Sequence, residues 1–445
     1  MARLTRFLPG LLGLTLALHG PLAVELQAAQ ISRRIAPEPV LRVLLLQGET
    51  ARLRPAAAAA GLRLRDAQGR LLQELPADRS LQLSLRDGWL QLVDAADPEG
   101  SVLQARELWL EAVPTAAEPD PGLWLQQRRY RGRLQARLEG GKLQLVNHLP
   151  LETYLASVVG SEMPASWPLE ALRAQAVAAR TYALKARKPA AAFDVQATTA
   201  SQMYKGVEAE TPSTRAAVEA TRGEVLTYDD ALIDAVFHSS SGGSTEDSSG
   251  LWQRQLPYLV SVPDFDEASP VRDWRQPLEQ AQLRKAFPEL DGALTIEILS
   301  STPTGRVRQA RVVGPRGELR LSGAQLRSRL GLKSTWVRFE LASTPVVAAP
   351  VALTPAAPAT AAAFPVAMDG APLFAPPPLP QMSQLPQLVA VGRGFGHGIG
   401  MSQWGALAMA QRGDSYAAIL RHYYRGTQLR PYSELALTAL AAGRP

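Results

Sequence analysis

The sequence predicts an α+β protein with a mixed arrangement of helices and strands. From Leu41 to about Asn147, apolar and polar residues alternate with a period of two, as in half-buried strands. Beyond this region, helical patterns alternate with short strand-like runs, without the regular strand and helix order of a doubly wound sheet. We therefore expect a β-hairpin-rich N-terminal part, followed by helices and further strands.

The composition is that of a folded, globular chain. Of the 445 residues, 46% are hydrophobic and 20% are charged, which excludes a mainly disordered or fibrous protein. The length allows two or three domains. Cysteine is absent, which excludes disulfide bonds, thiol nucleophiles and thiolate metal ligands.

The N-terminus is typical of a secretory signal. Arg3 and Arg6 precede an apolar run from Phe7 to Leu18, and small and polar residues follow. The run is short for a bilayer-spanning helix, but no clean cleavage site follows it. We expect either a cleaved signal or an N-terminal anchor, and hence an exported protein of the periplasm or cell envelope.

The net charge of +6 favours an anionic partner. Outside the cytoplasm, this indicates a cell-wall polymer or a membrane surface rather than nucleic acid, and we expect no membrane contact beyond a possible N-terminal anchor. The alternative is a charge that serves solubility alone, because acidic and basic residues interleave along most of the chain.

The N-terminal part is predicted to contain three hairpins. Two of them have two-residue turns, at Asp87-Gly88 and Gly140-Gly141, which are typical of tight connections between antiparallel strands. The three segments are LRLRDAQGRLL, LQLSLRDGWLQLV and RLQARLEGGKLQLV.

A helix is predicted between Pro168 and Arg187, and Arg173 and Arg180 fall on its apolar face. A buried charge without a partner costs roughly 3–5 kcal/mol, so each guanidinium needs an anion. Two interpretations stay open. The arginines form salt bridges or reach water, or their face lines a cleft and positions an anionic sugar or a nearby acidic side chain.

Glu162 is the nearest acidic residue before that helix, in a predicted turn between Ser161 and Met163. A glutamate at the apolar rim of a cleft is a candidate general acid, because partial burial raises the pKa of a carboxyl group. Adjacent arginines would instead lower the pKa of this carboxyl group.

Two loops supply further candidates. The segment HSSSGGST, starting at His238, combines an imidazole with hydroxyl groups but lacks the G-x-S-x-G pattern. A serine hydrolase that uses Ser240 or Ser241 with His238 is therefore kept only as an alternative. Glycines alternate from Gly392 to Gly400, which would leave one strand face open to another backbone or to a sugar ring.

The histidines show no spacing typical of metal ligands, and the glycines do not match a dinucleotide-binding motif. We therefore expect no metal site and no cofactor.

Three long blocks of the sequence resemble the SpoIID/LytB family of cell-wall proteins. They are LPLETYLASVVGSEMPASWPLEALRAQAVAARTYAL, FHSSSGGSTEDSSGLW with PYLVSVPD, and GRGFGHGIGMSQWGALAMAQRGDSYAAILRHYYRGT. The resemblance spans roughly Leu41 to Leu429 and implies a mixed SpoIID-like fold with a helix-lined cleft. A Pro- and Ala-rich segment at 345–388 departs from it and is expected to be a disordered insert.

SpoIID-type members are lytic transglycosylases that act on peptidoglycan glycan strands, especially strands without stem peptides. The resemblance implies that Glu162 is the catalytic residue, acting first as acid and then as base while a 1,6-anhydro ring closes on the muramic acid. A second carboxylate is then dispensable. The residues expected to bind the glycan are Arg173, Gln175, Arg180, Tyr182, His238, Ser240, Ser241, His397 and Gln403.

Two further expectations come from the resemblance. Some relatives hold zinc with a histidine and cysteines near the Ser/Gly loop, and this chain, without cysteine, is expected to lack that site. LytB-type members are described as modifiers of a wall amidase. The alternative function is therefore a non-catalytic wall-binding protein that enhances an N-acetylmuramoyl-L-alanine amidase, with peptidoglycan strands and that amidase as partners.

The expected domain organisation follows from these segments. It comprises a signal peptide or anchor at 1–29, a β-rich region at 30–130, a SpoIID/LytB domain at 131–430 with the insert at 345–388, and a C-terminal tail at 431–445.

Overall fold

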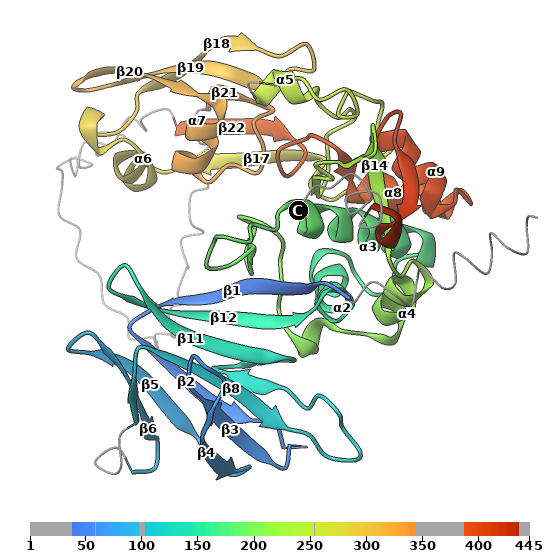
Figure 1. The fold of residues 1–445 in the computed structure, drawn as a ribbon. Coiled ribbons are helices and arrows are strands. Elements are labelled where there is room, and N and C mark those ends of the chain that lie inside the picture. The colour runs from blue at the N-terminus through green and yellow to red at the C-terminus, as the bar shows by residue number, and fades with distance from the viewer. Residues whose placement is uncertain (1–37, 58, 98–102, 253, 343–386, 436–445) are drawn as a thin grey trace, which may run out of the picture. The chain divides into compact units, whose positions relative to one another are not determined.

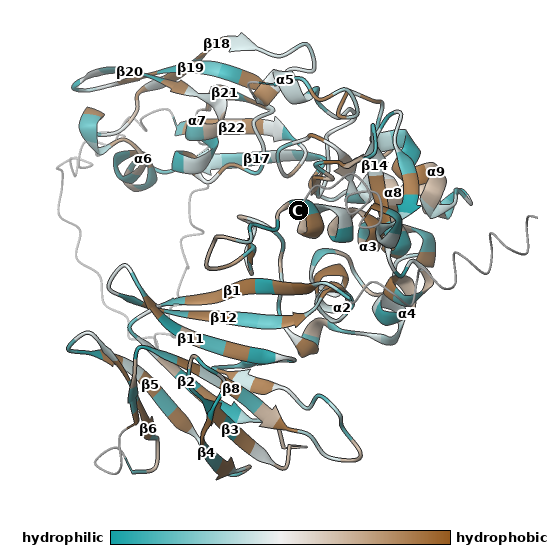
Figure 2. Cartoon of the chain, viewed as in Figure 1, coloured by the Kyte–Doolittle hydropathy of each residue, from teal (hydrophilic) through white to brown (hydrophobic). Residues whose placement is uncertain are grey.

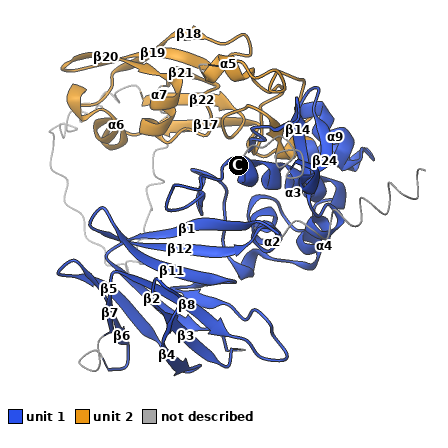
Figure 3. Cartoon of the chain, in the orientation of Figure 1, with its two compact units in different colours: residues 1–237, 406–445 blue, residues 238–405 orange. Residues whose placement is uncertain are grey.

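The computed structural model describes residues 38–57, 59–97, 103–252, 254–342 and 387–435 (Figure 1). The predicted signal or anchor and the predicted insert up to residue 386 lie outside these residues. The chain divides into two compact units (Figure 3). Unit 1 comprises residues 1–237 and 406–445, and unit 2 comprises residues 238–405.

The predicted α+β class is confirmed, because both units combine helices with antiparallel strands. Unit 1 begins with two sheets, and β11 and β12 of the first contact β6 and β5 of the second. The first sheet has the order β13-β1-β12-β11-β8-β3-β4. Its strands are β1 (Val40–Gly48), β3 (Gly61–Arg65), β4 (Leu71–Pro76), β8 (Glu107–Val113), β11 (Arg133–Glu139), β12 (Lys142–Pro150) and β13 (Val195–Gln196).

The second sheet has the order β10-β9-β2-β5-β6-β7. Its strands are β2 (Thr50–Pro55), β5 (Leu81–Arg86), β6 (Trp89–Asp94), β7 (Leu103–Ala105), β9 (Leu123–Leu125) and β10 (Arg128–Tyr130). Hydrophobic and hydrophilic residues alternate along strands such as β3 and β5 (Figure 2), and the apolar ones, such as Leu64 and Leu83, are buried. This alternation places one face of each strand in the core.

The three predicted hairpins are confirmed. They are the antiparallel pairs β3–β4, β5–β6 and β11–β12. Asp87, Gly88, Gly140 and Gly141 all have positive φ, as a two-residue turn between twisted strands requires.

The first helix of unit 1, α2, follows β12 directly. The helix α3 contacts α2, α4, α9 and β14 and is therefore central to this part of the unit. The helices are α2 (Leu151–Glu162), α3 (Leu169–Lys185), the 3-10 turn η1 (Val207–Ala209), α4 (Pro212–Ala220) and α9 (Tyr416–Tyr423). A small sheet completes the unit, with β14 (Glu224–Tyr228) between β15 (Ala231–Leu232) and β24 (Gln428–Pro431).

These units differ from the predicted domains. The predicted boundary between residues 130 and 131 does not separate compact units, because β11 pairs with β8 on one side and with β12 on the other. The predicted domain at 131–430 is instead divided at His238. The chain passes between the units within β16 (Phe237–His238) and again within α8 (Gln403–Gln411).

Unit 2 has two three-stranded sheets in its described residues, and both contribute to one core around Phe287 and Leu326. One sheet consists of β17 (Asp273–Leu278), β22 (Gln387–Arg393) and β21 (Val337–Ala342), and the other of β18 (Thr295–Ser301), β19 (Val307–Gly314) and β20 (Gly317–Ser322). The remaining elements are α5 (Ser248–Leu251), α6 (Gln280–Ala286), η2 (Pro288–Leu290), α7 (Gly323–Leu330) and β23 (Met401–Ser402), which pairs with β16. The last two residues of the predicted insert thus begin the central strand β22.

Among the described residues, none of the helices combines the length and the apolar character that crossing a bilayer requires.

Candidate functional site

Glu162 is the last residue of α2, directly before the turn that leads into α3. Its side chain is half-buried, and its Oε1 accepts a hydrogen bond of 2.8 Å from the backbone N–H of Met203. The helix ends here because the next residue, Met163, is extended and Pro164 follows. The predicted candidate acid is therefore at a helix end, with one carboxylate oxygen held by the backbone.

The groups around Glu162 include Gln202 and Met203, which were not among the residues predicted from the sequence. Tyr154, on α2, is fully buried and donates a hydrogen bond of 3.0 Å to Oε1 of Gln202. Gln202 in turn donates to the carbonyl of Ala179 on α3. Burial, and then the charge of Glu162 and the nearby Tyr182, raise the pKa of Tyr154 well above its usual value. The 202–203 segment thus ties α2 and α3 together beside the carboxylate.

Arg180 points into the core of unit 1, as predicted, but it meets a carboxylate of the protein. Its guanidinium is completely buried and forms a two-pronged ion pair with Glu152, with Nη2 at 2.6 Å and Nε at 2.9 Å. Further bonds from its terminal nitrogens reach the carbonyls of Val218 and Glu224. Arg180 was expected to bind glycan; in this structure its hydrogen-bonding groups are used within the fold.

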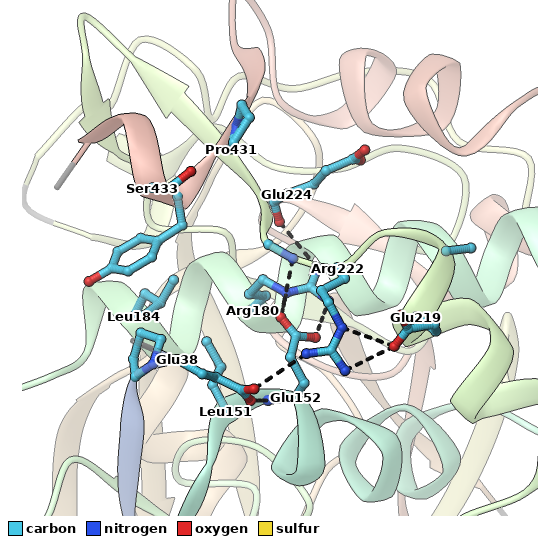
Figure 4. Close-up of a pocket in the computed structure, with 14 residues that line it drawn as sticks. Glu38, Leu151, Glu152, Arg180, Leu184, Glu219, Arg222, Glu224, Pro431 and Ser433 are labelled. Atoms are coloured by element: carbon cyan, nitrogen blue, oxygen red, sulfur yellow. Dashed lines mark hydrogen bonds and ion pairs between the residues drawn. The ribbon is translucent and has the colours of Figure 1, made fainter. Parts of the chain in front are cut away.

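A cavity of about 380 Å³ lies beside this ion pair (Figure 4). Arg180 and Arg222 line it together with four glutamates, and Glu162 does not line it. The four carboxylates accept bonds from Arg222, Arg180, Tyr416 and backbone groups. The carboxylates of the cavity wall therefore already have partners within the protein, and we assign the cavity no role.

Arg173 differs from Arg180 in its environment. It is partly exposed and forms an ion pair of 2.6 Å with Glu170, one turn earlier on α3. The other oxygen of Glu170 accepts from the backbone N–H of Tyr416 at the start of α9. The helix α3 is buried on more than one side, with 12 of its 17 residues buried.

Gln175 and Tyr182 also lie on α3. Gln175 is fully buried, and neither atom of its amide group has a partner within the described structure. Tyr182 is half-buried and lies close enough to Tyr154 to contribute to its raised pKa, after burial and Glu162. Of the predicted glycan-binding residues, Tyr182 is therefore one that lies near Tyr154, as Glu162 does.

His238 and His397 come together in unit 2, with ring centroids 5.4 Å apart. Nδ1 of His238 donates to the carbonyl of Ile399, and Nδ1 of His397 accepts from the N–H of the same residue. His238 is buried, and burial, then the charges of His397 and Arg306, hold its pKa well below the usual value. His238 is therefore a neutral imidazole with its proton on Nδ1.

Ser240 and Ser241 are each 1% exposed, and their hydroxyl groups donate to Asp266 and Asp264, respectively. A hydroxyl has one proton to donate, so neither serine donates to His238 in this structure. The serines were expected to contact glycan; in this structure their hydroxyl groups form hydrogen bonds within the fold. The serine-hydrolase alternative loses its support for the same reason. Asp264 is the last residue of the block PYLVSVPD and Asp266 lies two residues beyond it, but no local pattern indicated their contacts with the serines.

The alternating glycines are explained by close contacts within unit 2. A Cβ on Gly396 would lie 2.6 Å from the Cβ of His238, and a Cβ on Gly398 would lie 2.2 Å from the guanidinium carbon of Arg306. Both glycines have positive φ, so this stretch is a loop rather than a strand. The groups that approach these glycines are thus the protein's own, including a backbone, as one interpretation predicted, and not a sugar.

The remaining predicted residue, Gln403, is buried at the start of α8. No three His, Asp or Glu side chains come together as metal ligands would within the residues that the structure describes. The predicted site residues therefore form two groups. Glu162, Arg173, Gln175, Arg180 and Tyr182 belong to unit 1, and His238, Ser240, Ser241, His397 and Gln403 belong to unit 2.

Comparison with known proteins identifies relatives that carry these segments. Residues 139–228 match the family model SpoIID, described as stage II sporulation protein. The chain is 32% identical over 306 residues to stage II sporulation protein D of Bacillus subtilis (strain 168), which covers 64% of this chain and 76% of that protein. It is 35% identical over 302 residues to the amidase enhancer of the same organism, which covers 62% of this chain.

The chain spans only 40% of the length of the amidase enhancer. The matched family segment contains α2, α3 and Glu162. The chain belongs to the SpoIID family.

Proposed function

We propose that this protein is exported and acts on the peptidoglycan of the cell envelope as a lytic transglycosylase, with Glu162 as its acid and base. The observation that carries the proposal is the position of Glu162, half-buried at the end of α2 with Oε1 held by the N–H of Met203. A carboxyl group whose position is set by the backbone is suited to proton transfer, because the transfer requires a fixed distance to the reacting oxygen.

In the proposed reaction, the carboxyl group of Glu162 gives its proton to the oxygen that links N-acetylmuramic acid to N-acetylglucosamine. As the bond from C1 of the muramic acid to that oxygen breaks, the 6-hydroxyl oxygen of the same sugar bonds to C1. The carboxylate of Glu162 takes the hydroxyl proton, which restores the acid. No water is consumed, so one carboxyl group is sufficient, in contrast to classical glycoside hydrolysis.

The test is the release of anhydro-sugars from purified glycan strands by Glu162→Gln, measured by mass spectrometry. We expect the loss of at least a hundredfold in rate, since the amide cannot donate or accept the proton as a carboxyl group does. The matched control is Glu219→Gln, which changes an exposed glutamate on α4 of the same unit and should keep the parental rate. Release at the parental rate by Glu162→Gln would refute the proposed acid.

A second function is favoured by the 35% identity to the amidase enhancer. In this case the protein binds the wall without cleaving it and increases the rate of an N-acetylmuramoyl-L-alanine amidase. The assay is amidase release of stem peptides with and without the protein. Stimulation that persists in Glu162→Gln, together with no anhydro-sugar from the unaltered protein, would establish this second function and exclude the first.

A further inference from the structure

Unit 2 contains a cavity of about 610 Å³, within the size range of small-molecule sites. It lies between α5, the start of β19 and the helix α7, and His397 contributes to its wall. No aspartate or glutamate is among the residues that line it, whereas Arg308 and Arg327 are. This sets it apart from the cavity beside Arg180, whose wall carries four glutamates.

The two arginines of this cavity are not neutralised within the described part of the protein. Neither Arg308 nor Arg327 forms an ion pair there, although Arg306 and Arg311 on either side of Arg308 do. Arg327, on α7, uses its Nε to bond the carbonyl of Leu332. Burial alone lowers the pKa of Arg327, with no carboxylate acting in the opposite direction.

The charge of Arg327 affects the pKa of two neighbouring groups. It adds to burial in lowering the pKa of both His238 and Arg306. A bound anion near Arg327 would be attracted by this charge, which no carboxylate of the protein offsets at Arg327 itself.

Thr335 supplies an independent observation. Its side chain is 5% exposed and lines the cavity, and its hydroxyl has no hydrogen-bond partner within the described structure. A buried hydroxyl without a partner is unfavourable, because it has lost its hydrogen bonds to water. A ligand that carries hydrogen-bonding oxygens or nitrogens would supply the missing partner of this side chain.

Trp252 completes the site. It is one of the large hydrophobic side chains that stay exposed, at 37%, although it lines a cavity. Its ring is tilted toward that of His397, with centroids 6.5 Å apart. A large aromatic surface next to fixed cations fits a pyranose ring, whose C–H face is apolar and whose substituents are polar.

We propose that this cavity binds an acidic sugar residue, with the ring against Trp252, the anionic group at Arg308 and Arg327, and a hydroxyl or acetamido group at Thr335. The anion is a carboxylate or a phosphate on the sugar. The assignment of the sugar to the wall polymer rests on the proposed function. The assignment of an acidic sugar rests on the cavity alone. The site would hold a strand through unit 2, independently of the acid in unit 1.

The experiment is a titration of the full-length, ¹⁵N-labelled protein with single sugars, followed at the indole N–H cross-peaks. Loss of one peak in Trp252→Phe assigns the signal of Trp252. N-acetylmuramic acid tests the carboxylate, N-acetylglucosamine 1-phosphate tests the phosphate, and N-acetylglucosamine is the neutral comparison. We expect the Trp252 peak to shift with an acidic sugar at an affinity at least tenfold above that of the neutral sugar.

Variants test the assignment of each group. Arg327→Gln and Arg308→Gln should each weaken binding of the acidic sugar at least fivefold, and Thr335→Val should weaken binding of all the sugars. Arg308 is exposed and forms no ion pair with another described residue, so its variant tests the site without a risk to folding. Arg320→Gln removes an equal charge from β20 outside the cavity and should bind as the parent does.

Response to only one of the acidic sugars identifies the anion. Equal affinity for the neutral and acidic sugars, no response of Trp252 to any of them, or unchanged binding in both Arg308→Gln and Arg327→Gln would overturn the proposal. Because binding needs no cleavage, Glu162→Gln should titrate as the parent does. A failure of the proposed catalytic activity and a failure of this site are thus distinguishable.

Discussion

Arg180 of α3 and Glu152 of α2 form a buried ion pair, in which two guanidinium nitrogens contact the two carboxylate oxygens at 2.9 and 2.6 Å. The same carboxylate also accepts from the N–H of Gly223, ahead of β14. One pair of side chains thus joins two helices and the start of a strand.

Breaking this pair should strongly destabilise unit 1. Arg180→Met leaves the carboxylate of Glu152 buried without its cation, and we expect a loss of about 3–5 kcal/mol in the free energy of unfolding. Urea unfolding followed by circular dichroism measures it. Arg173→Met is the control, because a partly exposed pair on one helix contributes at most about 1 kcal/mol.

The double variant Arg180→Met/Glu152→Leu separates the charge from the packing. With neither charge left in the core, it should be more stable than Arg180→Met alone. A double variant whose loss equals the sum of the two single losses would show that the two side chains do not interact as described.

Gly398→Ala should destabilise unit 2 because two costs combine. Its φ is +85°, which L-residues rarely adopt, and the new Cβ would lie 2.2 Å from the guanidinium carbon of Arg306. We expect a loss of more than about 2 kcal/mol. Gly317→Ala, at a positive φ with open space around it, isolates the backbone cost. Equal melting temperatures for the two variants would contradict the proposed clash.

The stability of unit 1 should fall as the pH is lowered from 6.5 to about 4, in part through His148. Burial, and then the charges of Arg133 and Arg42, lower the pKa of His148 to about 4. Between these pH values the unfolded chain binds a proton that the folded chain does not, so acid favours unfolding. At pH 5 the resulting loss in the free energy of unfolding is on the order of 1–2 kcal/mol for a partly buried group.

His148→Gln should remove that component. The difference in unfolding free energy between pH 7.5 and pH 5 should shrink by the amount given above, as measured by urea titrations at both pH values. An undiminished difference would mean that His148 titrates in the folded protein as it does in the unfolded chain.

Ser240 should act as a structural hydrogen-bond donor and not as a nucleophile. Its hydroxyl donates to Asp266, which is completely buried. Ser240→Ala deprives that carboxylate of a donor, and we expect a loss of about 1–3 kcal/mol. A fluorophosphonate probe should leave the unaltered protein unlabelled. Labelling that disappears in Ser240→Ala would restore the serine-hydrolase alternative.

The sequence by itself determined the features that depend on neighbours along the chain. The strand period of two, the turn residues at Asp87-Gly88 and Gly140-Gly141, and the helix between Pro168 and Arg187 each rest on local backbone preference, and the structure has all of them. The α+β class and the SpoIID family followed from such local patterns.

The tertiary structure alone decided which partners the charged and polar side chains have. Arg180 was correctly predicted to point inward, but Glu152 lies 28 residues away along the chain, and helical periodicity does not indicate which carboxylate will be met. Asp266 and Ser240 are likewise 26 residues apart. The neighbours of the alanine-rich helix α3 could not be predicted either, because alanine fits a face packed against another helix as well as one packed against a strand. Partner choice depends on long-range packing, and no single stretch of sequence encodes it.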